Sequence, residues 1–154
     1  MKQLIEKLYL LLIRVASSLE SPFLLLVRVY WGIQMHGTGR GKIHDIGKVI
    51  DFFTSLGIPA PAANAYFVSG LEFIGGFLLI IGLASRPIAL MLVIDMIVAY
   101  ITADREALMS FASDPDKFTA AAPFVFLFSS LIVLIFGPGK LSVDAVLARR
   151  FQKK

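Results

Sequence analysis

The stretch that decides the fold is YFVSGLEFIGGFLLIIGLASRPIALMLVIDMIVAYITA, residues 66–103. It holds two apolar runs, 66–84 and 87–103, separated by a short polar junction at Ser85 and Arg86. A helix needs about 17–25 mostly apolar residues to cross a bilayer, and both runs reach that length. The stretch therefore predicts a helical hairpin inside a membrane.

Two further segments, 21–37 and 120–137, have the same apolar character. The chain is 57% hydrophobic and only 17% charged, whereas an ordinary soluble domain has about 25% charged residues. We therefore predict an all-α fold, an integral membrane four-helix bundle that forms a single transmembrane domain over 1–154. A chain of 154 residues with four spans leaves no room for a second domain.

The segments outside the spans also show helical patterns. Apolar residues at helical spacing predict an amphipathic helix over about 2–19, which would lie in the headgroup layer. A cleaved signal peptide is the alternative, although Glu6 and Arg14 interrupt the expected basic-then-apolar order. The longest loop, about 36–65, is expected to contain a short helix in IGKVIDFFTSLG, and a short basic helix is expected in the tail 140–154.

The distribution of basic residues predicts the orientation. Nine Lys and Arg residues lie outside the spans on the side that holds both termini, and five lie on the other side. The positive-inside rule then places both termini in the cytoplasm of a multi-pass protein of the cell inner (plasma) membrane.

Three of the apolar segments each carry one charge: Arg28, Glu72 and Asp95. A lone charge at mid-span costs at least about 2.5–3.5 kcal/mol, so these residues need partners. Counting residues from the outer helix ends gives all three similar depths, roughly 9–14 Å, and predicts one interhelical cluster. Its surplus negative charge favours a proton on Glu72 or Asp95, or a bound cationic or hydrogen-bond-donating group. A purely structural Arg28–Glu72 ion pair is the alternative.

Five other residues are candidates for ligand binding around that cluster. His36 and Lys42 lie at a membrane exit and could line the mouth of a site, and Tyr30 has a polar tip near the same interface. Gly75 and Gly76 follow Glu72 by one turn, and their missing side chains either admit a neighbouring helix or leave room for a ligand. An interfacial aromatic belt and a histidine bonded to a backbone carbonyl are the corresponding structural interpretations.

The composition limits the chemistry that the chain can perform alone. It contains no cysteine and two histidines, so no metal, haem or flavin site is evident. Basic residues are spread over the loops and ends, which argues against nucleic acid as a partner. Any redox reaction would need electrons from a soluble or membrane redox partner subunit.

Four sequence landmarks together resemble the DoxX/DoxD family of small four-helix membrane proteins: LLVRVYWGIQMHGTGRGK, LGIPAPAA, SGLEFIGGFLLIIGLASRPIAL and FGPGKLSVDA. The resemblance covers about 24–145. It implies a membrane partner in redox processes, such as a subunit of thiosulfate:quinone oxidoreductase, a component of an oxidative-stress complex, or a protein linked to quinone and catechol resistance. Arg28, His36, Lys42 and Glu72 fall on the family's polar pattern, whereas Asp95 rests on the depth argument alone.

The sequence therefore predicts a quinone-linked membrane component with quinone as its cofactor. Arg28 would stabilise developing negative charge on the quinone, while Glu72 or Asp95 would exchange a proton with it. A non-enzymatic anchor or assembly subunit is the alternative, and a small proton-coupled carrier is less favoured because no inverted repeat is evident. Whether the chain forms a homo-oligomer stays open.

Overall fold

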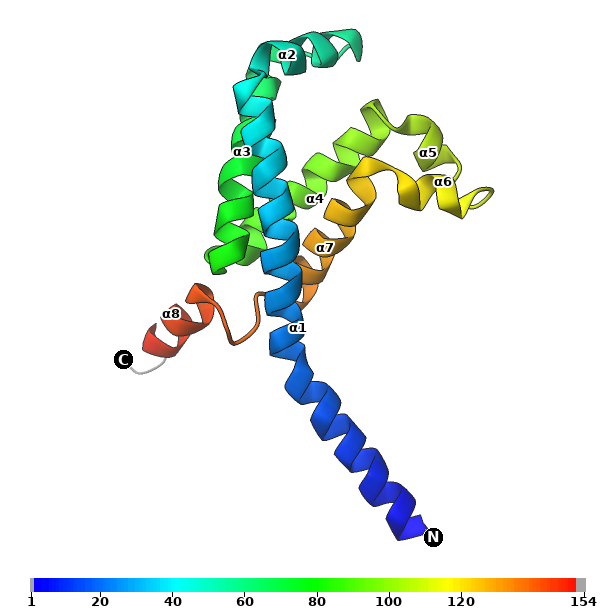
Figure 1. Ribbon diagram of the computed structural model, residues 1–154, viewed down its shortest axis with the longest axis vertical. Helices are drawn as coiled ribbons and strands as arrows, with labels where there is room; N and C mark the ends of the chain where they lie inside the picture. The colour runs from blue at the N-terminus through cyan, green and yellow to red at the C-terminus, as the bar shows by residue number, and fades with distance from the viewer. Residues whose placement is uncertain (1, 152–154) are drawn as a thin grey trace.

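The computed structural model describes residues 2–151, all of whose regular structure is helical (Figure 1). Residues 152–154 of the predicted tail lie outside that range. They include two of the nine basic residues from which the orientation is predicted. The helices are α1 (Lys2–His44), α2 (Ile46–Ser55), α3 (Pro61–Ile81), α4 (Ser85–Thr102), α5 (Arg105–Met109), α6 (Pro115–Ala120), α7 (Ala122–Phe136) and α8 (Val143–Phe151). The predicted all-α class is confirmed.

Three helices, α1, α3 and α4, are long and apolar enough to cross a membrane. The fourth apolar helix, α7, has 15 residues, which is shorter than the usual span of about 17–25. The chain is therefore a membrane protein by the length and composition of its helices, while the count of four spans stays a prediction.

The first helix is much longer than predicted. The expected amphipathic helix 2–19 and the span 21–37 form one helix of 43 residues, with Pro22 inside it. The N-terminal part of α1 leaves the axis of the rest (Figure 1), as expected near a proline, which removes one helical hydrogen bond and crowds the preceding turn.

The predicted loop over 36–65 is wrong in its first half, because α1 continues through HGTGRGK to His44. Close contact with α3 explains why this glycine-rich segment is helical. A Cβ added to Gly39 would lie 2.7 Å from the Cα of Phe73, and one added to Gly76 would lie 2.5 Å from the backbone nitrogen of His36. This packing of backbone against backbone offsets the low helix propensity of glycine.

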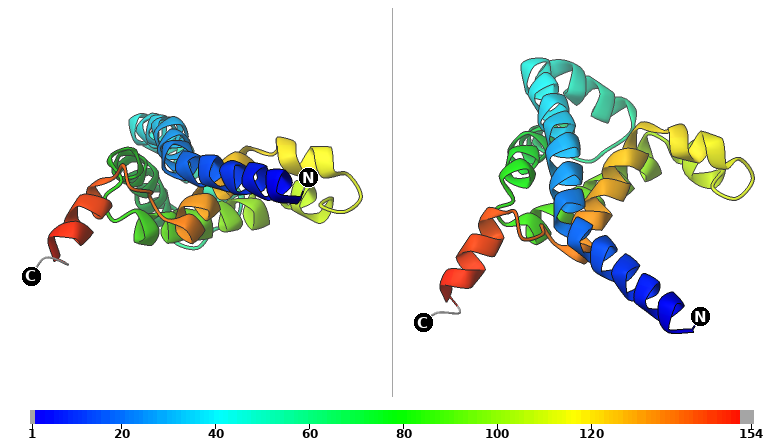
Figure 2. Two further views of the ribbon diagram at one scale, coloured as in Figure 1. Left: turned by 90° about the horizontal axis from the view of Figure 1, so that it is seen from below. Right: turned by 60° about the horizontal axis from the view of Figure 1, so that its bottom comes forward.

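The apolar helices pack in two pairs, α1 with α3 and α4 with α7, around a shared core (Figure 1). A tight turn joins α3 to α4, with Gly82 in the left-handed conformation at φ 72°. From this turn the axes of α3 and α4 diverge, as both Figure 1 and the right view of Figure 2 show. We call the end of the molecule away from the turn, where the two helix axes are farther apart, the open end.

The FGPGKLSVDA segment holds the α3–α4 turn in place. Both carboxylate oxygens of Asp144 accept hydrogen bonds from the start of α4, from the backbone N–H groups of Ala84 and Ser85, each at 2.8 Å. The backbone N–H of Asp144 in turn donates to the carbonyl of Gly82 at 2.9 Å. Asp144 thus acts as a helix cap that comes from a distant part of the chain.

Asp144→Ala is expected to lower the free energy of unfolding by about 1–2 kcal/mol, because loss of an N-terminal cap costs about 0.5–2 kcal/mol. The measurement is thermal unfolding of the purified protein in mild detergent. Asp116→Ala, which removes an exposed carboxylate in α6, serves as the matched control. Equal stability of the two variants would show that the cap is dispensable.

Candidate functional site

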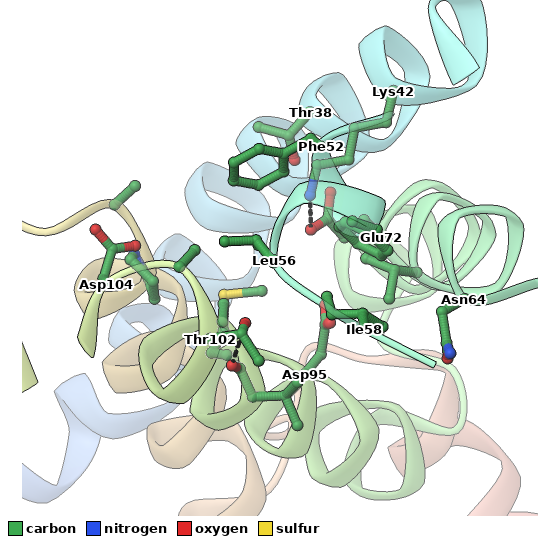
Figure 3. A pocket seen from close by; sticks show the side chains of 18 of the residues that line it. Thr38, Lys42, Phe52, Leu56, Ile58, Asn64, Glu72, Asp95, Thr102 and Asp104 are labelled. Atoms are coloured by element: carbon green, nitrogen blue, oxygen red, sulfur yellow. Dashed lines mark hydrogen bonds and ion pairs between the residues drawn. The ribbon is translucent and has the colours of Figure 1, made fainter. Parts of the chain in front are cut away.

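A cavity of about 400 Å³ lies at the open end of the molecule, between α1, α2, α3, α4 and the start of α7 (Figure 3). Most of its wall is apolar, including Phe52, Phe53 and Leu56 from the α2 region and Met96 from α4. The polar side chains on its wall are Thr38, Lys42, Asn64, Glu72, Asp95, Thr102 and Asp104. A mostly apolar pocket with a few converging polar groups is the usual form of a small-molecule site.

An ion pair between Lys42 and Glu72 forms the polar end of the cavity. The Nζ of Lys42 lies 2.5 Å from Oε1 of Glu72. Glu72 is only 2% exposed, and the Lys42 side chain is 35% exposed. Lys42 reaches this position because α1 extends past its predicted end at residue 37 to His44.

Glu72 and Asp95 both carry an oxygen without a hydrogen-bond partner. Among the described residues, nothing donates to Oε2 of Glu72 or to Oδ2 of Asp95, although both atoms are buried. The two side chains line the same cavity from α3 and α4 (Figure 3). Buried polar atoms are rarely left unpaired, so these oxygens are candidates to accept hydrogen bonds from a ligand.

The arrangement therefore offers a ligand one cationic donor and two free acceptors. Two carboxylates face one ammonium group, so the site suits a neutral molecule with hydroxyl or carbonyl groups better than an anion. A ring compound whose oxygens are carbonyls in one redox state and hydroxyls in the other could use both kinds of contact. Lys42 would donate to a carbonyl, and Glu72 or Asp95 would accept from a hydroxyl.

Arg28 does not join Glu72 and Asp95, so the predicted cluster of three charges is not formed. Its guanidinium donates to the carbonyls of Leu79 at 2.8 Å, Ile80 at 3.3 Å and Leu141 at 2.6 Å. Leu79 follows Glu72 by seven residues, about 10 Å along α3. The depth estimate failed because it took residue 37 as the end of the first span.

Two other predicted ligand residues, His36 and Tyr30, do not line the cavity. Nδ1 of His36 lies 2.8 Å from the carbonyl oxygen of Phe73, and the imidazole stacks on the phenyl ring of the same residue. Tyr30 is exposed on the helix surface, where its ring contacts Trp31 edge to face. The structure thus brings together Lys42, Glu72 and Asp95 from the predicted set.

Gly75 and Gly76 pack against neighbouring helices. A Cβ on Gly75 would lie 3.2 Å from Ile88 of α4, and one on Gly76 would meet the backbone of α1 at Gly32 and His36. Of the two interpretations left open for this pair, the structure shows the one in which the glycines admit other helices.

The sequence did not predict that aromatic residues of α2 line the cavity. Phe52 and Phe53 come from α2, a helix with no buried residue, and reach the cavity wall. Their pattern in IGKVIDFFTS predicts an amphipathic helix and could have placed its apolar face over a site. The polar residues Thr38, Asn64 and Thr102 have no sequence signal that separates them from ordinary helix positions.

Two comparisons with known proteins, one with a family model and one with a single relative, found significant similarity to this chain. The DoxX family model matches residues 23–105, which include Lys42, Glu72 and Asp95. "Putative oxidoreductase CatD" of Bacillus subtilis (strain 168) is 31% identical over 120 residues, covering 78% of this chain and 83% of the relative. No solved structure matches the chain.

Proposed function

This chain belongs to the DoxX family, and from that premise we propose that it is the quinone-binding component of a membrane redox system. The observation that carries the proposal is the cavity in which Lys42, Glu72 and Asp95 meet within a mostly apolar wall. The name of the relative from Bacillus subtilis, "Putative oxidoreductase CatD", supports a redox role.

The three polar residues suit both redox states of a quinone. A quinone carbonyl would accept a hydrogen bond from Nζ of Lys42, and a quinol hydroxyl would donate to Oε2 of Glu72 or Oδ2 of Asp95. Reduction of a quinone takes up two electrons and two protons. The carboxyl groups would exchange protons as general acids and bases, while a redox partner subunit supplies the electrons.

In this proposal the protein lies in the cell membrane with both termini in the cytoplasm, so the cavity opens near the outer face. Lys42 lies in the last turn of α1, at the end opposite the N-terminus. The quinone site would then lie in the outer half of the bilayer.

A second candidate function, a non-enzymatic anchor or assembly subunit, is favoured by the N-terminal part of α1. Residues 3–20 are exposed throughout and include large apolar side chains on all sides of the helix. A partner protein or the lipid itself could cover this segment. In that role Glu72→Gln would disturb folding or assembly without changing the occupancy of any ligand.

The experiment is mass spectrometry of organic extracts from protein purified in mild detergent, with extracts of a mock purification as background. We expect near-stoichiometric quinone in the wild type and a drop of at least about tenfold in Glu72→Gln and Asp95→Asn, because each variant weakens an acceptor of the quinol. Asp51→Asn, an exposed carboxylate of α2 outside the cavity wall, should keep wild-type occupancy.

Two results would count against the quinone role. Quinone no higher than in the mock extract in every sample would remove its support. Unchanged quinone but altered elution of Glu72→Gln in gel filtration would favour the assembly subunit.

A further inference from the structure

A second cavity of about 210 Å³ lies between α3 and α4, beside the first. Phe67 and Leu71 from α3 face Met91 and Ile94 from α4 across it. Both cavities share the wall residues Asn64, Val68, Asp95 and Val98. We call the second cavity the α3–α4 opening, and the shared wall residues place it next to the candidate quinone site.

The divergence of α3 and α4 creates this opening. Near their connecting turn the helices are in close contact, with the Cβ position of Gly75 3.2 Å from Ile88. Farther from the turn their axes separate (Figures 1 and 2), and the α3–α4 opening lies along this part of the helices.

The outer rim of the opening is apolar and exposed. Phe67 is 57% exposed and Ile94 is 54% exposed, and both belong to helices that are long and apolar enough to span a membrane. In a bilayer such side chains face acyl chains. A lipophilic molecule can therefore approach the opening from the lipid, whereas a water-soluble one cannot.

We propose that the quinone site is loaded sideways from the bilayer through the α3–α4 opening and that its ligand is a ring compound with a long apolar chain. The inference rests on the proposed quinone function and adds the ligand's class and route. The ring would occupy the larger cavity, whose roughly 400 Å³ is near the lower end of the range for small-ligand sites, about 300–1,000 Å³. In this proposal a long apolar chain attached to the ring extends into the opening, whose wall is mostly apolar.

Asp95 lines both cavities, so it can contact a ligand that passes from one to the other. A polar group buried within the membrane is costly unless it has a partner, and Oδ2 of Asp95 has none among the described residues. A hydroxyl on the incoming ring would provide that partner at the junction. Asp95 and Asn64 are thus the polar residues of the opening that a ring entering from the lipid meets.

The test compares two ligands with the same ring in protein reconstituted into lipid nanodiscs. The probes are decylubiquinone, which has a chain, and its parent dimethoxy-methyl-benzoquinone, which has none. Ile94→Trp narrows the opening but does not touch the larger cavity, and Ile97→Trp places the same bulk on an exposed face of α4 outside both cavities. Both substitutions replace exposed residues, and Met91→Trp substitutes for Ile94→Trp if that variant elutes as aggregate.

We expect Ile94→Trp to weaken decylubiquinone binding by at least about tenfold and to leave binding of the chainless quinone unchanged. Ile97→Trp should bind both probes as the wild type does. Equal binding of decylubiquinone to all three proteins would overturn entry through the opening while keeping the quinone site. Failure of the wild type to bind either probe would overturn the quinone function itself and this inference with it.

Discussion

Gly39→Ala is expected to destabilise the folded protein by about 3 kcal/mol, at the upper end of the usual cost of overpacking. The added Cβ would lie 2.7 Å from the Cα of Phe73 and 2.8 Å from the carbonyl carbon of Glu72. These are backbone atoms of α3, which no change of rotamer can move. The two helices must therefore separate. Thermal unfolding in mild detergent measures the loss.

Gly41→Ala is the matched control for this prediction. It adds the same methyl group two residues later in α1, where no atom lies within 4 Å of the new Cβ. Alanine is the better helix former, so Gly41→Ala should leave stability unchanged or raise it by up to about 1 kcal/mol. If the two variants unfold at the same temperature, close packing of α1 on α3 does not contribute to stability.

Gly39→Ala should also reduce quinone occupancy. Its clash involves the backbone of Glu72 itself, so a separation of α1 from α3 moves Glu72 away from Lys42. The same extracts that test the quinone role would report this change.

Arg28→Met is expected to have a comparable effect on stability, about 3 kcal/mol. The Arg28 side chain is 1% exposed and donates to three carbonyls, two at the end of α3 and one at Leu141. The carbonyl of Leu79 would still accept from the backbone N–H of Gly82 at 3.2 Å. The partly buried carbonyls of Ile80 and Leu141 would lose the guanidinium as donor. A buried acceptor left unpaired costs about 1–3 kcal/mol. Removal of the buried charge offsets part of this loss of unfolding free energy, because burying the guanidinium is itself unfavourable. Thermal unfolding in detergent again gives the loss.

Two comparisons make the Arg28 prediction specific. Arg14→Met removes an exposed arginine from the same helix and should change stability little. Arg28→Lys keeps the charge but loses the planar guanidinium, which bonds to α3 and Leu141 together. The stability of Arg28→Lys should therefore lie between that of the wild type and that of Arg28→Met. Full stability of Arg28→Met would show that the guanidinium contacts are not needed to hold the α3–α4 turn.

The helical hairpin could be predicted closely from the sequence, because its signal is a long apolar run. The expected spans 66–84 and 87–103 correspond to Pro61–Ile81 and Ser85–Thr102. The early start of α3 has a physical reason, since proline is well suited to the first turn of a helix. The loop predicted over about 36–65 includes residues 61–65, which the structure shows as the first residues of α3.

The first span shows where local reasoning fails. Three glycines in HGTGRGK, residues 36–42, favour a loop by their intrinsic propensity, yet α1 is helical there because Gly39 packs against α3. Tertiary packing of this kind has no local signal in the sequence. The same error displaced the depth assigned to Arg28, and so its predicted partner.

The candidate site was partly predictable for a related reason. Glu72 and Asp95 line one cavity, as their similar depths indicated, because each lies in a helix whose position was predicted closely. Their basic partner was misassigned: Lys42 fills that place, on a part of α1 that was expected to be a loop. The periodicity of IGKVIDFFTS predicts the apolar face of α2, but not that this helix folds back to place Phe52 and Phe53 on the cavity wall.

The contacts that Arg28 and the start of α4 make with Leu141 and Asp144 also have a consequence for the order of biosynthesis. These contacts join residues separated by 113 and 60 positions, and the later partner in each is synthesised after α7. Until then a nascent chain holds a guanidinium and two amide groups without those partners. Insertion of the earlier helices into the membrane can therefore precede closure of the fold.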